Sequence, residues 1–346
     1  MYGLETQRVN LNSKQDREEL EEFLLRFNLN LDKDVDYSLV IKDNNEIKAT
    51  CSKTKSVLKC FAVDESLRGE GITAALITNL IDKLFQEGVF HSFIFTKPEN
   101  IEIFSSLSFK LIHQVENVAL LESGIYDINS YLEKLVKKNN LDDTEKAALV
   151  MNCNPFTLGH RYLIEKAAEE NKEVLVFIVE EDKSLFPYDI RYKLVKEGIA
   201  DLENVKVIPG GEYIISSATF PSYFLREEGT RLKAYTELDA GIFAKYFCKK
   251  LNIKKRYVGT EPYCNVTNSY NKSLKEVLNK HSIELKVVER KSHEDYKISA
   301  STVRQLIREG NMEELKYILP KPTLEFLYSE QGKTIIERIK SNNTPH

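Results

Sequence analysis

The sequence predicts an α/β protein with two domains: a mixed α+β domain, then a doubly wound parallel-sheet domain. Three strand-like runs follow one another directly between residues 37 and 64, which is typical of an antiparallel meander. From residue 147 onward, strand-like runs alternate with helical sequence, as in parallel sheets built from βαβ units. The length of 346 residues leaves room for two such domains.

The first half begins with a helix and continues with short strands. The expected elements are a helix at 17–29 and strands at 37–43, 46–53 and 58–64. Asn44 and Asn45 separate the first two strands, and asparagine tolerates the left-handed backbone that a tight hairpin requires. The third strand leads into a turn with two glycines and then a helix from Ile72.

A polar stretch at residues 139–146 follows a predicted helix at 125–138 and separates the two halves. The predicted domains therefore cover residues 1–122 and 147–346, joined by a helix and linker at 123–146. Strands of the second domain are expected at 147–154, 174–182, 205–210, 255–260 and 283–290, with helices at 158–170 and from about residue 189.

Composition excludes several classes of protein. Lysine and arginine number 49 against 53 acidic residues, a net charge of −4, so no global basic field favours nucleic acid. The five cysteines form no CxxC pair, and such a set fits the reduced thiols of the cytosol. The charged N-terminus is unlike a signal peptide, and no apolar run reaches the roughly 20 residues that span a bilayer. We therefore expect a cytoplasmic protein without membrane or nucleic-acid partners.

Arg68, Gly69 and Gly71 lie at the transition from the third strand to the next helix. Exposed backbone N–H groups at the positive end of a helix dipole form an anion site. A turn that simply requires glycine would give the same local pattern. Further along, residues 97–112 have the pattern of a strand, a short helix and a final strand.

This order of elements resembles the GCN5-related acetyltransferase (GNAT) fold, whose pyrophosphate loop reads Arg/Gln-x-x-Gly-x-Gly/Ala. Here Thr73 stands where that loop has its last small residue. The resemblance covers residues 1–122 and implies a site for a CoA-like arm at Arg68, Gly69 and Gly71. No catalytic acid or base stands out in this half of the chain.

In the second half, the strand at 147–154 ends in Asn-Pro-Phe-Thr-Leu-Gly-His, residues 154–160. Pro155 cannot continue a central strand, and Thr157 can cap the helix that follows. Gly159 would let a ligand approach the backbone. His160 and Arg161 are cations in the first helical turn, where each costs about 0.3–1 kcal/mol unless an anion is present. A capped helix with an ordinary surface histidine is the simpler alternative.

A second helix, late in the chain, is also expected to begin with hydroxyl side chains and a cation. Ser301 is expected to cap the helix, and Arg304 stands where a capping box would have glutamate or glutamine. Two helix starts with a cation and hydroxyls, both predicted at the carboxyl edge of one sheet, suggest a shared polyphosphate.

Together the two motifs resemble the HxGH nucleotidyltransferase superfamily, in which they hold the triphosphate of ATP while its α-phosphate is attacked. The chain is also similar to the citrate lyase ligase family, in which an acetyltransferase-like module precedes this domain. The stretches that carry this similarity are 154–160, 259–262, 263–271 and 298–304.

This resemblance implies an enzyme that uses ATP and Mg²⁺ to activate acetate as acetyl-AMP, with release of pyrophosphate. The acetyl group would then acylate the thiol of the CoA-like prosthetic group, a phosphoribosyl-dephospho-CoA arm, on the acyl-carrier subunit of citrate lyase. No protein metal ligand is implied, because Mg²⁺ is expected as the counter-ion of ATP.

The resemblance also implies roles for particular residues. His160 would stabilise the phosphate charge that develops in the transition state, Thr157 would orient His160, and Ser301 and Arg304 would hold the β- and γ-phosphates. Arg191 could equally be a surface arginine on a helix, and Glu261 could equally cap one. The expected ATP contacts are Asn154, Pro155, Phe156, Gly159, Arg191, Gly259, Glu261, Ser299 and Ser301.

Two other functions remain open from the sequence. The same ATP motifs would serve a nucleotidyltransferase that adenylylates a phosphopantetheine-type phosphate ester. A protein that only senses a nucleotide or an acyl-CoA would keep both folds without catalysis. Release of pyrophosphate that depends on acetate separates the ligase from both.

Overall fold

The computed structural model describes residues 5–67, 69–180, 183–216, 220, 222–225, 227–260, 265–289, 292–293 and 296–341. Its contacts divide the chain into two compact units, residues 1–131 with 221–238, and residues 132–220 with 239–346. The sequence boundaries at 122 and 147 did not anticipate that residues 221–238 belong with the first unit. No local pattern distinguishes this segment from its surroundings, because what places it is contact with residues far away in the sequence.

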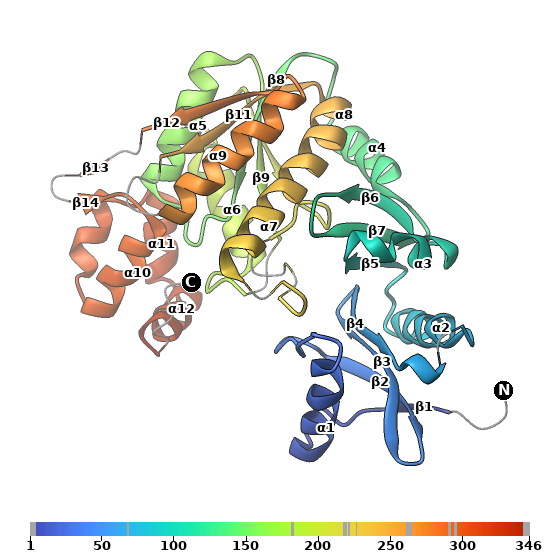
Figure 1. The fold of residues 1–346 in the computed structure, drawn as a ribbon. Coiled ribbons are helices and arrows are strands. Elements are labelled where there is room, and N and C mark those ends of the chain that lie inside the picture. The colour runs from blue at the N-terminus through green and yellow to red at the C-terminus, as the bar shows by residue number, and fades with distance from the viewer. Residues whose placement is uncertain are drawn as a thin grey trace. The chain divides into compact units, whose positions relative to one another are not determined.

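The first unit contains a seven-stranded sheet in the order β1-β2-β3-β4-β5-β7-β6 (Figure 1). Asn44 and Asn45 have φ values of 51° and 66°, which confirms the tight hairpin between β2 and β3. The strands are β1 (Thr6–Arg8), β2 (Tyr37–Asp43), β3 (Glu46–Thr54), β4 (Val57–Val63), β5 (His91–Thr96), β6 (Lys110–Gln114) and β7 (Ala119–Gly124). The helices are α1 (Lys14–Leu25), α2 (Ile72–Gln86) and α3 (Ile101–Ser106), with 3₁₀ turns at Glu65–Leu67 and Pro98–Asn100. Helix α4 (Ile128–Lys138) begins in this unit and continues into the second, which starts at Leu132.

Strands β4 and β5 form the one parallel pair of this sheet among its described strands, and they soon separate. Only Val57 with Phe93 and Leu58 with Ile94 are paired. Cys60, in the middle of β4, has a φ of 56°, a conformation that interrupts a regular strand. Beyond Leu58 the two strands therefore diverge, and their backbone groups face a gap.

The second unit contains a five-stranded parallel sheet in the order β10-β9-β8-β11-β12 (Figure 1), which confirms the doubly wound class. Its strands are β8 (Lys146–Met151), β9 (Val174–Ile178), β10 (Val205–Pro209), β11 (Ile253–Gly259) and β12 (Glu284–Val288), and a short hairpin pairs β13 (Ser292–His293) with β14 (Tyr296–Lys297). The helices are α5 (Leu158–Glu170), α6 (Tyr188–Gly198), a π-helical stretch Phe243–Cys248, α8 (Lys249–Leu251), α9 (Asn265–Lys280), α10 (Ala300–Glu309), a 3₁₀ stretch Met312–Tyr317, α11 (Lys321–Tyr328) and α12 (Glu330–Ser341). Helix α7 (Glu228–Ile242) is shared, because the first unit ends at residue 238.

The strand order reverses between β8 and β11. From β8 the chain adds β9 and β10 on one side of the sheet, whereas β11 and β12 lie on the other side. In open α/β sheets, ligands bind at the carboxyl ends of the strands on either side of such a reversal. All five residues of β9 are buried, as expected for a strand covered by helices on both faces. The polar loops at the carboxyl ends of β8 and β11 are therefore the part of this sheet best placed to hold a ligand.

A buried ion pair ties β4 to the loop that precedes β2. Lys59 Nζ lies 3.0 Å from Asp32 Oδ2, and the two side chains are 3% and 8% exposed. Lys48 on β3 makes a contact of the same length, 3.0 Å, with Glu46, but the Glu46 side chain is 67% exposed. The two pairs differ in burial and not in distance.

We predict that Lys59→Met destabilises the first unit by about 3 kcal/mol, because it leaves the Asp32 carboxylate buried without its cation. Lys48→Met, the matched control, should cost less than about 1 kcal/mol. Urea unfolding followed by circular dichroism, with amide hydrogen exchange of β4 peptides, measures both. Equal effects of the two substitutions would contradict the prediction.

Candidate nucleotide site

The loop after β8 positions His160 through the start of α5. Thr157 is the N-cap of α5, as predicted, and its Oγ1 accepts a hydrogen bond from the His160 backbone N–H at 3.3 Å. The Thr157 N–H donates to His160 Nδ1 at 3.1 Å, so His160 fills the capping-box position that glutamate or glutamine usually holds. Because Nδ1 accepts, the ring proton of neutral His160 belongs on Nε2, which makes Nε2 the donor atom of the ring.

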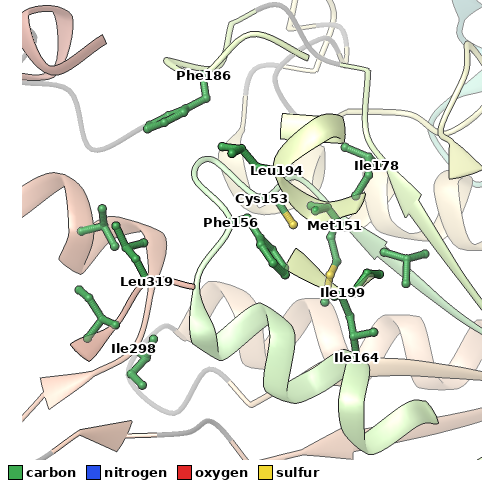
Figure 2. Close-up of a cluster of buried hydrophobic side chains, with 14 of the residues drawn as sticks. Met151, Cys153, Phe156, Ile164, Ile178, Phe186, Leu194, Ile199, Ile298 and Leu319 are labelled. Carbon is green, nitrogen blue, oxygen red and sulfur yellow. The ribbon is translucent and has the colours of Figure 1, made fainter. Parts of the chain in front are cut away.

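Phe156 is expected to contact ATP, and the structure places its side chain on the core side of the loop. Its side chain is fully buried and lies in the hydrophobic cluster under the loop (Figure 2). A Cβ on Gly198 of α6 would lie 2.5 Å from the Phe156 ring, so the ring fills the space above that glycine. The Phe156 and His160 rings stack at 6.1 Å with an angle of 16°. Phe156 therefore supports the histidine from the core side.

Gly159 joins the first motif to the second. It was expected to admit a ligand, but a Cβ there would lie 2.6 Å from the carbonyl oxygen of Ile298. The missing side chain is needed because the backbone just before α10 packs against α5 at this point. The two motifs are thus in direct contact, as predicted from their shared place at the carboxyl edge.

The N-cap of α10 is Ser299 and not Ser301, which corrects the sequence prediction. Ser299 Oγ accepts from the Thr302 backbone N–H at 3.1 Å. The chain turns at Ser299 because the preceding residue, Ile298, is held against Gly159. Ser301 therefore lies inside the first helical turn, exposed, with its hydroxyl 2.8 Å from that of Ser299.

Arg304 does not extend from the helix start toward solvent. Its guanidinium Nη1 donates to the backbone carbonyl of Asn154 at 2.5 Å, and the residue is only 6% exposed. Burial, with a smaller contribution from Arg308, lowers the pKa of Arg304. The Asn154 side chain in turn accepts from the Phe186 backbone N–H at 3.0 Å. Arg304 and Asn154, both expected to touch ATP, are seen to hold the two motifs together.

Arg191 is a buried clamp and not the surface arginine that was the default expectation. It is fully buried, and its guanidinium donates to three carbonyls, those of Phe186 at 3.0 Å, Asn152 at 2.7 Å and Val179 at 2.9 Å. These carbonyls belong to the loops that follow β8 and β9. Arg191 therefore holds these two loops in position from beneath.

Arg161, expected to face a phosphate beside His160, points to other partners. Its guanidinium contacts Asp201 at 2.9 and 2.6 Å and Glu165 at 2.8 Å. The hydrogen bond that Arg161 donates to Asp201 is the main cause that raises the pKa of Arg161. The charge that this arginine would have offered to a ligand is thus used by acidic neighbours.

The structure describes some, but not all, of the remaining residues that are expected to contact ATP. Pro155 is buried in the loop after β8. Gly259 ends β11 on the other side of the strand reversal, and its carbonyl accepts from Asn271 Nδ2 at 3.4 Å. Glu261 lies outside the described residues. The sequence pattern did not single out Asn152, whose side-chain amide donates to Ser184 Oγ at 3.1 Å; a polar residue directly after a buried strand was the available signal.

The glycine turn of the first unit borders a cavity of about 800 Å³. Gly69 and Gly71 line it with φ values of 83° and 72°, and Gly71 is the N-cap of α2 without a side-chain hydrogen bond. A Cβ on either glycine would meet nothing within 4 Å, so both border open space. Arg68 lies outside the described residues.

The described cysteines are unsuited to carry an acyl group. Cys51, Cys60, Cys153 and Cys248 are free and buried. Burial raises the pKa of Cys153, beside the first motif, to about 12, so its thiol stays protonated at neutral pH.

Comparison with known proteins identifies the family. A family model described as the citrate lyase ligase C-terminal domain matches residues 146–327, and the acetyltransferase (GNAT) family model matches residues 6–104. A "[Citrate [pro-3S]-lyase] ligase" of Escherichia coli K12 is 36% identical over 92% of this chain and 92% of its own length. The protein of the same name from Haemophilus influenzae is 38% identical over 89% of this chain and 94% of its own.

The chain belongs to the citrate lyase ligase family. Both resemblances inferred from the motifs, to this family and to the GNAT fold, are confirmed. Among solved structures, a GNAT-family acetyltransferase from Staphylococcus aureus Mu50 aligns with 36% of this chain and all of its own, at 17% identity and a TM-score of 0.30. Within the described ranges of this citrate lyase ligase family member, no helix is both long and apolar enough to cross a lipid bilayer.

The clamp at Arg191 gives a prediction for this family member. Arg191→Lys should destabilise the second unit by about 2–4 kcal/mol, because one ammonium cannot reach three carbonyls in the geometry of a guanidinium. The affinity for ATP should fall in parallel, since the loops above lose their support. Lys193→Ala, an exposed change on the same helix, should alter stability by less than about 0.5 kcal/mol.

Thermal unfolding and calorimetric titration with ATP measure these two quantities. If Arg191→Lys weakened ATP binding while leaving stability unchanged, the guanidinium would have to contact the nucleotide directly.

Proposed function

We propose that the chain is an ATP-dependent ligase that activates acetate as acetyl-AMP and transfers the acetyl group to the thiol arm of citrate lyase. The observation that supports this most is the contact between the two motifs. Gly159 packs against Ile298 and Arg304 binds Asn154, so two helix N-termini meet at the strand reversal of a doubly wound sheet. Such a place suits the triphosphate of a nucleotide.

Within this site, His160 is proposed to donate its Nε2 proton to the phosphate oxygen on which charge develops. Thr157 fixes the ring by the hydrogen bonds described above, so no reorientation is needed during the reaction. Ser301, exposed in the first turn of α10, is the hydroxyl proposed to contact the β- or γ-phosphate. Arg304 contributes by holding Asn154 and the loop in place.

The proposed reaction has two steps. A carboxylate oxygen of acetate attacks the α-phosphorus of Mg²⁺–ATP, an O–P bond forms, and pyrophosphate leaves with the electrons of the bond that breaks. The thiol sulfur of the arm then attacks the acetyl carbon, AMP leaves, and the thiol proton passes to solvent. Mg²⁺ is proposed to enter with ATP as its counter-ion, as it does in many phosphoryl-transfer sites.

The first unit is proposed to bind the CoA-like arm on the acyl-carrier subunit of citrate lyase. Gly69 and Gly71 border the cavity at the start of α2, where backbone N–H groups favour a pyrophosphate, and Arg68 would add its charge. We also propose a cytoplasmic location, the compartment that supplies ATP and keeps thiols reduced.

The test of this function is release of pyrophosphate from Mg²⁺–ATP by the purified chain, with and without acetate. Deacetylated citrate lyase is then added and its activity followed. Release that requires acetate, with lyase activity restored, is expected. Release that ignores acetate but responds to phosphopantetheine would indicate a nucleotidyltransferase, and ATP binding without any turnover would indicate a sensor.

His160→Ala should lower kcat for acetate-dependent pyrophosphate release by about 10²–10³-fold, the usual effect of removing one preorganised donor. The free energy of unfolding should fall by only about 1 kcal/mol, because the substitution removes the one hydrogen bond that the Thr157 N–H donates to the ring. His281→Ala, an exposed histidine after α9, is the control and should keep its rate within about twofold. An unchanged rate in His160→Ala would refute the assigned role.

Arg68→Glu combined with Gly71→Asp should raise the KM for deacetylated citrate lyase by about tenfold or more, because two carboxylates would face an anionic arm. Acetate-dependent pyrophosphate release in the absence of lyase should not change. An unaltered KM would exclude the glycine turn as the docking site.

A further inference from the structure

A segment from the second half of the sequence contacts β5 of the first unit where β4 and β5 separate. We call residues Ser222–Leu225 the strap. It belongs to the first unit together with residues 1–131. Diverging strands leave backbone N–H and C=O groups without a neighbouring strand, and such groups need other partners. The strap supplies one, because the Tyr223 hydroxyl donates to the carbonyl of Phe95 near the end of β5.

Two further hydrogen bonds hold the strap, one through the backbone carbonyl of Tyr223 and one through the side chain of Ser222. The Asn30 N–H donates to the carbonyl of Tyr223 at 2.9 Å. The Ser222 hydroxyl donates to Asp32 Oδ1 at 2.6 Å, and Asp32 is the carboxylate that the buried Lys59 neutralises. The strap is thus attached to β5, to the loop before β2 and, through Asp32, to β4.

The strap is also a wall of the 800 Å³ cavity. Tyr223 and Phe224 line it, with ring centroids 4.7 Å apart, together with Phe61 of β4 and Phe95 of β5. The glycine turn, with Gly69 and Gly71, lines another part of the same cavity. Ser222 and Leu225 are strap residues that are not among its lining residues. The cavity therefore combines a glycine turn suited to phosphate with an aromatic wall to which the strap adds Tyr223 and Phe224.

We infer that the strap is part of the binding site for the CoA-like thiol arm and that Tyr223 is a residue that binds the arm. This inference rests on the proposed function for the class of ligand. The Tyr223 and Phe224 rings pack against the apolar parts of a pantetheine chain. The Tyr223 oxygen, whose proton goes to Phe95, keeps lone pairs that accept from an amide N–H of that chain.

The environment of Tyr223 agrees with this role. The residue is 5% exposed, and burial raises the pKa of its hydroxyl well above the usual value. The hydroxyl therefore stays neutral, and it acts as a hydrogen-bonding group in an aromatic wall and not as a base.

The experiment uses the full chain and calorimetric titration with dephospho-CoA as the probe. Tyr223→Ala should weaken binding by about tenfold or more, because the aromatic wall is lost. Tyr223→Phe keeps the ring but removes its anchor to Phe95, and should weaken binding by about threefold. Leu225→Ala is the matched control: it truncates a buried strap residue, 7% exposed, that does not line the cavity, and should keep the affinity within about twofold.

A competition experiment distinguishes binding of the arm from binding of the protein that carries it. The acyl-carrier subunit with its arm should displace dephospho-CoA, whereas the subunit without the arm should not. If the armless subunit displaced the probe equally well, or if Leu225→Ala weakened binding as much as Tyr223→Ala, the strap would be structural and the inference wrong.

The failure of this inference can be told apart from failure of the proposed function. If the unmodified chain releases pyrophosphate in response to acetate but does not bind dephospho-CoA, the inference is wrong and the ligase function stands. If dephospho-CoA binds and the Tyr223 variants weaken it while acetate causes no release, the inference stands and the ligase function is wrong.

Discussion

The hydrogen bond from Arg304 to the backbone carbonyl of Asn154, 2.5 Å long and buried, is the constraint on which the candidate nucleotide site depends. It ties the start of α10 to the loop after β8, two segments far apart in the sequence. The packing of Gly159 against Ile298 also holds these two segments together. Each motif alone would be a helix start with an unusual cation. Joined, they present two helix N-termini and a histidine donor to one region at the edge of the sheet.

The arginines around this region bind acidic side chains and backbone carbonyls of the protein itself. Arg161 is paired with Asp201 and Glu165, and Arg191 and Arg304 donate to backbone carbonyls. Loops at the carboxyl ends of strands carry many carbonyl groups that face away from the sheet, and buried guanidinium groups satisfy several of them at once. Within the described part of the two motifs, the groups proposed to meet a phosphate are therefore the His160 imidazole, the Ser301 hydroxyl and the helix N-termini. These are weaker than a free arginine but fixed in position, which is what transition-state stabilisation requires.

Much of this could be predicted from the sequence because it is local. Alternation of strands and helices indicated the parallel sheet, the Asn44-Asn45 pair indicated the hairpin, and Thr157 was recognisable as a cap. The burial of Phe156 and the clamp at Arg191 could not be predicted, since each depends on a partner distant in sequence. The cap of α10 was placed two residues too late, because both Ser299 and Ser301 are good caps and the local pattern does not choose between them. The strap is the clearest case: Tyr223 is an ordinary aromatic residue until the gap between β4 and β5 is known.

The most direct test of the joined site is a double-mutant cycle on the affinity for a non-hydrolysable ATP analogue. His160→Ala, Ser301→Ala and the double variant are titrated by calorimetry under the same conditions. If one triphosphate contacts both motifs, the two changes should couple by about 1 kcal/mol. If the free-energy changes add within about 0.3–0.5 kcal/mol, the motifs do not share a ligand and the account of a single nucleotide site is wrong.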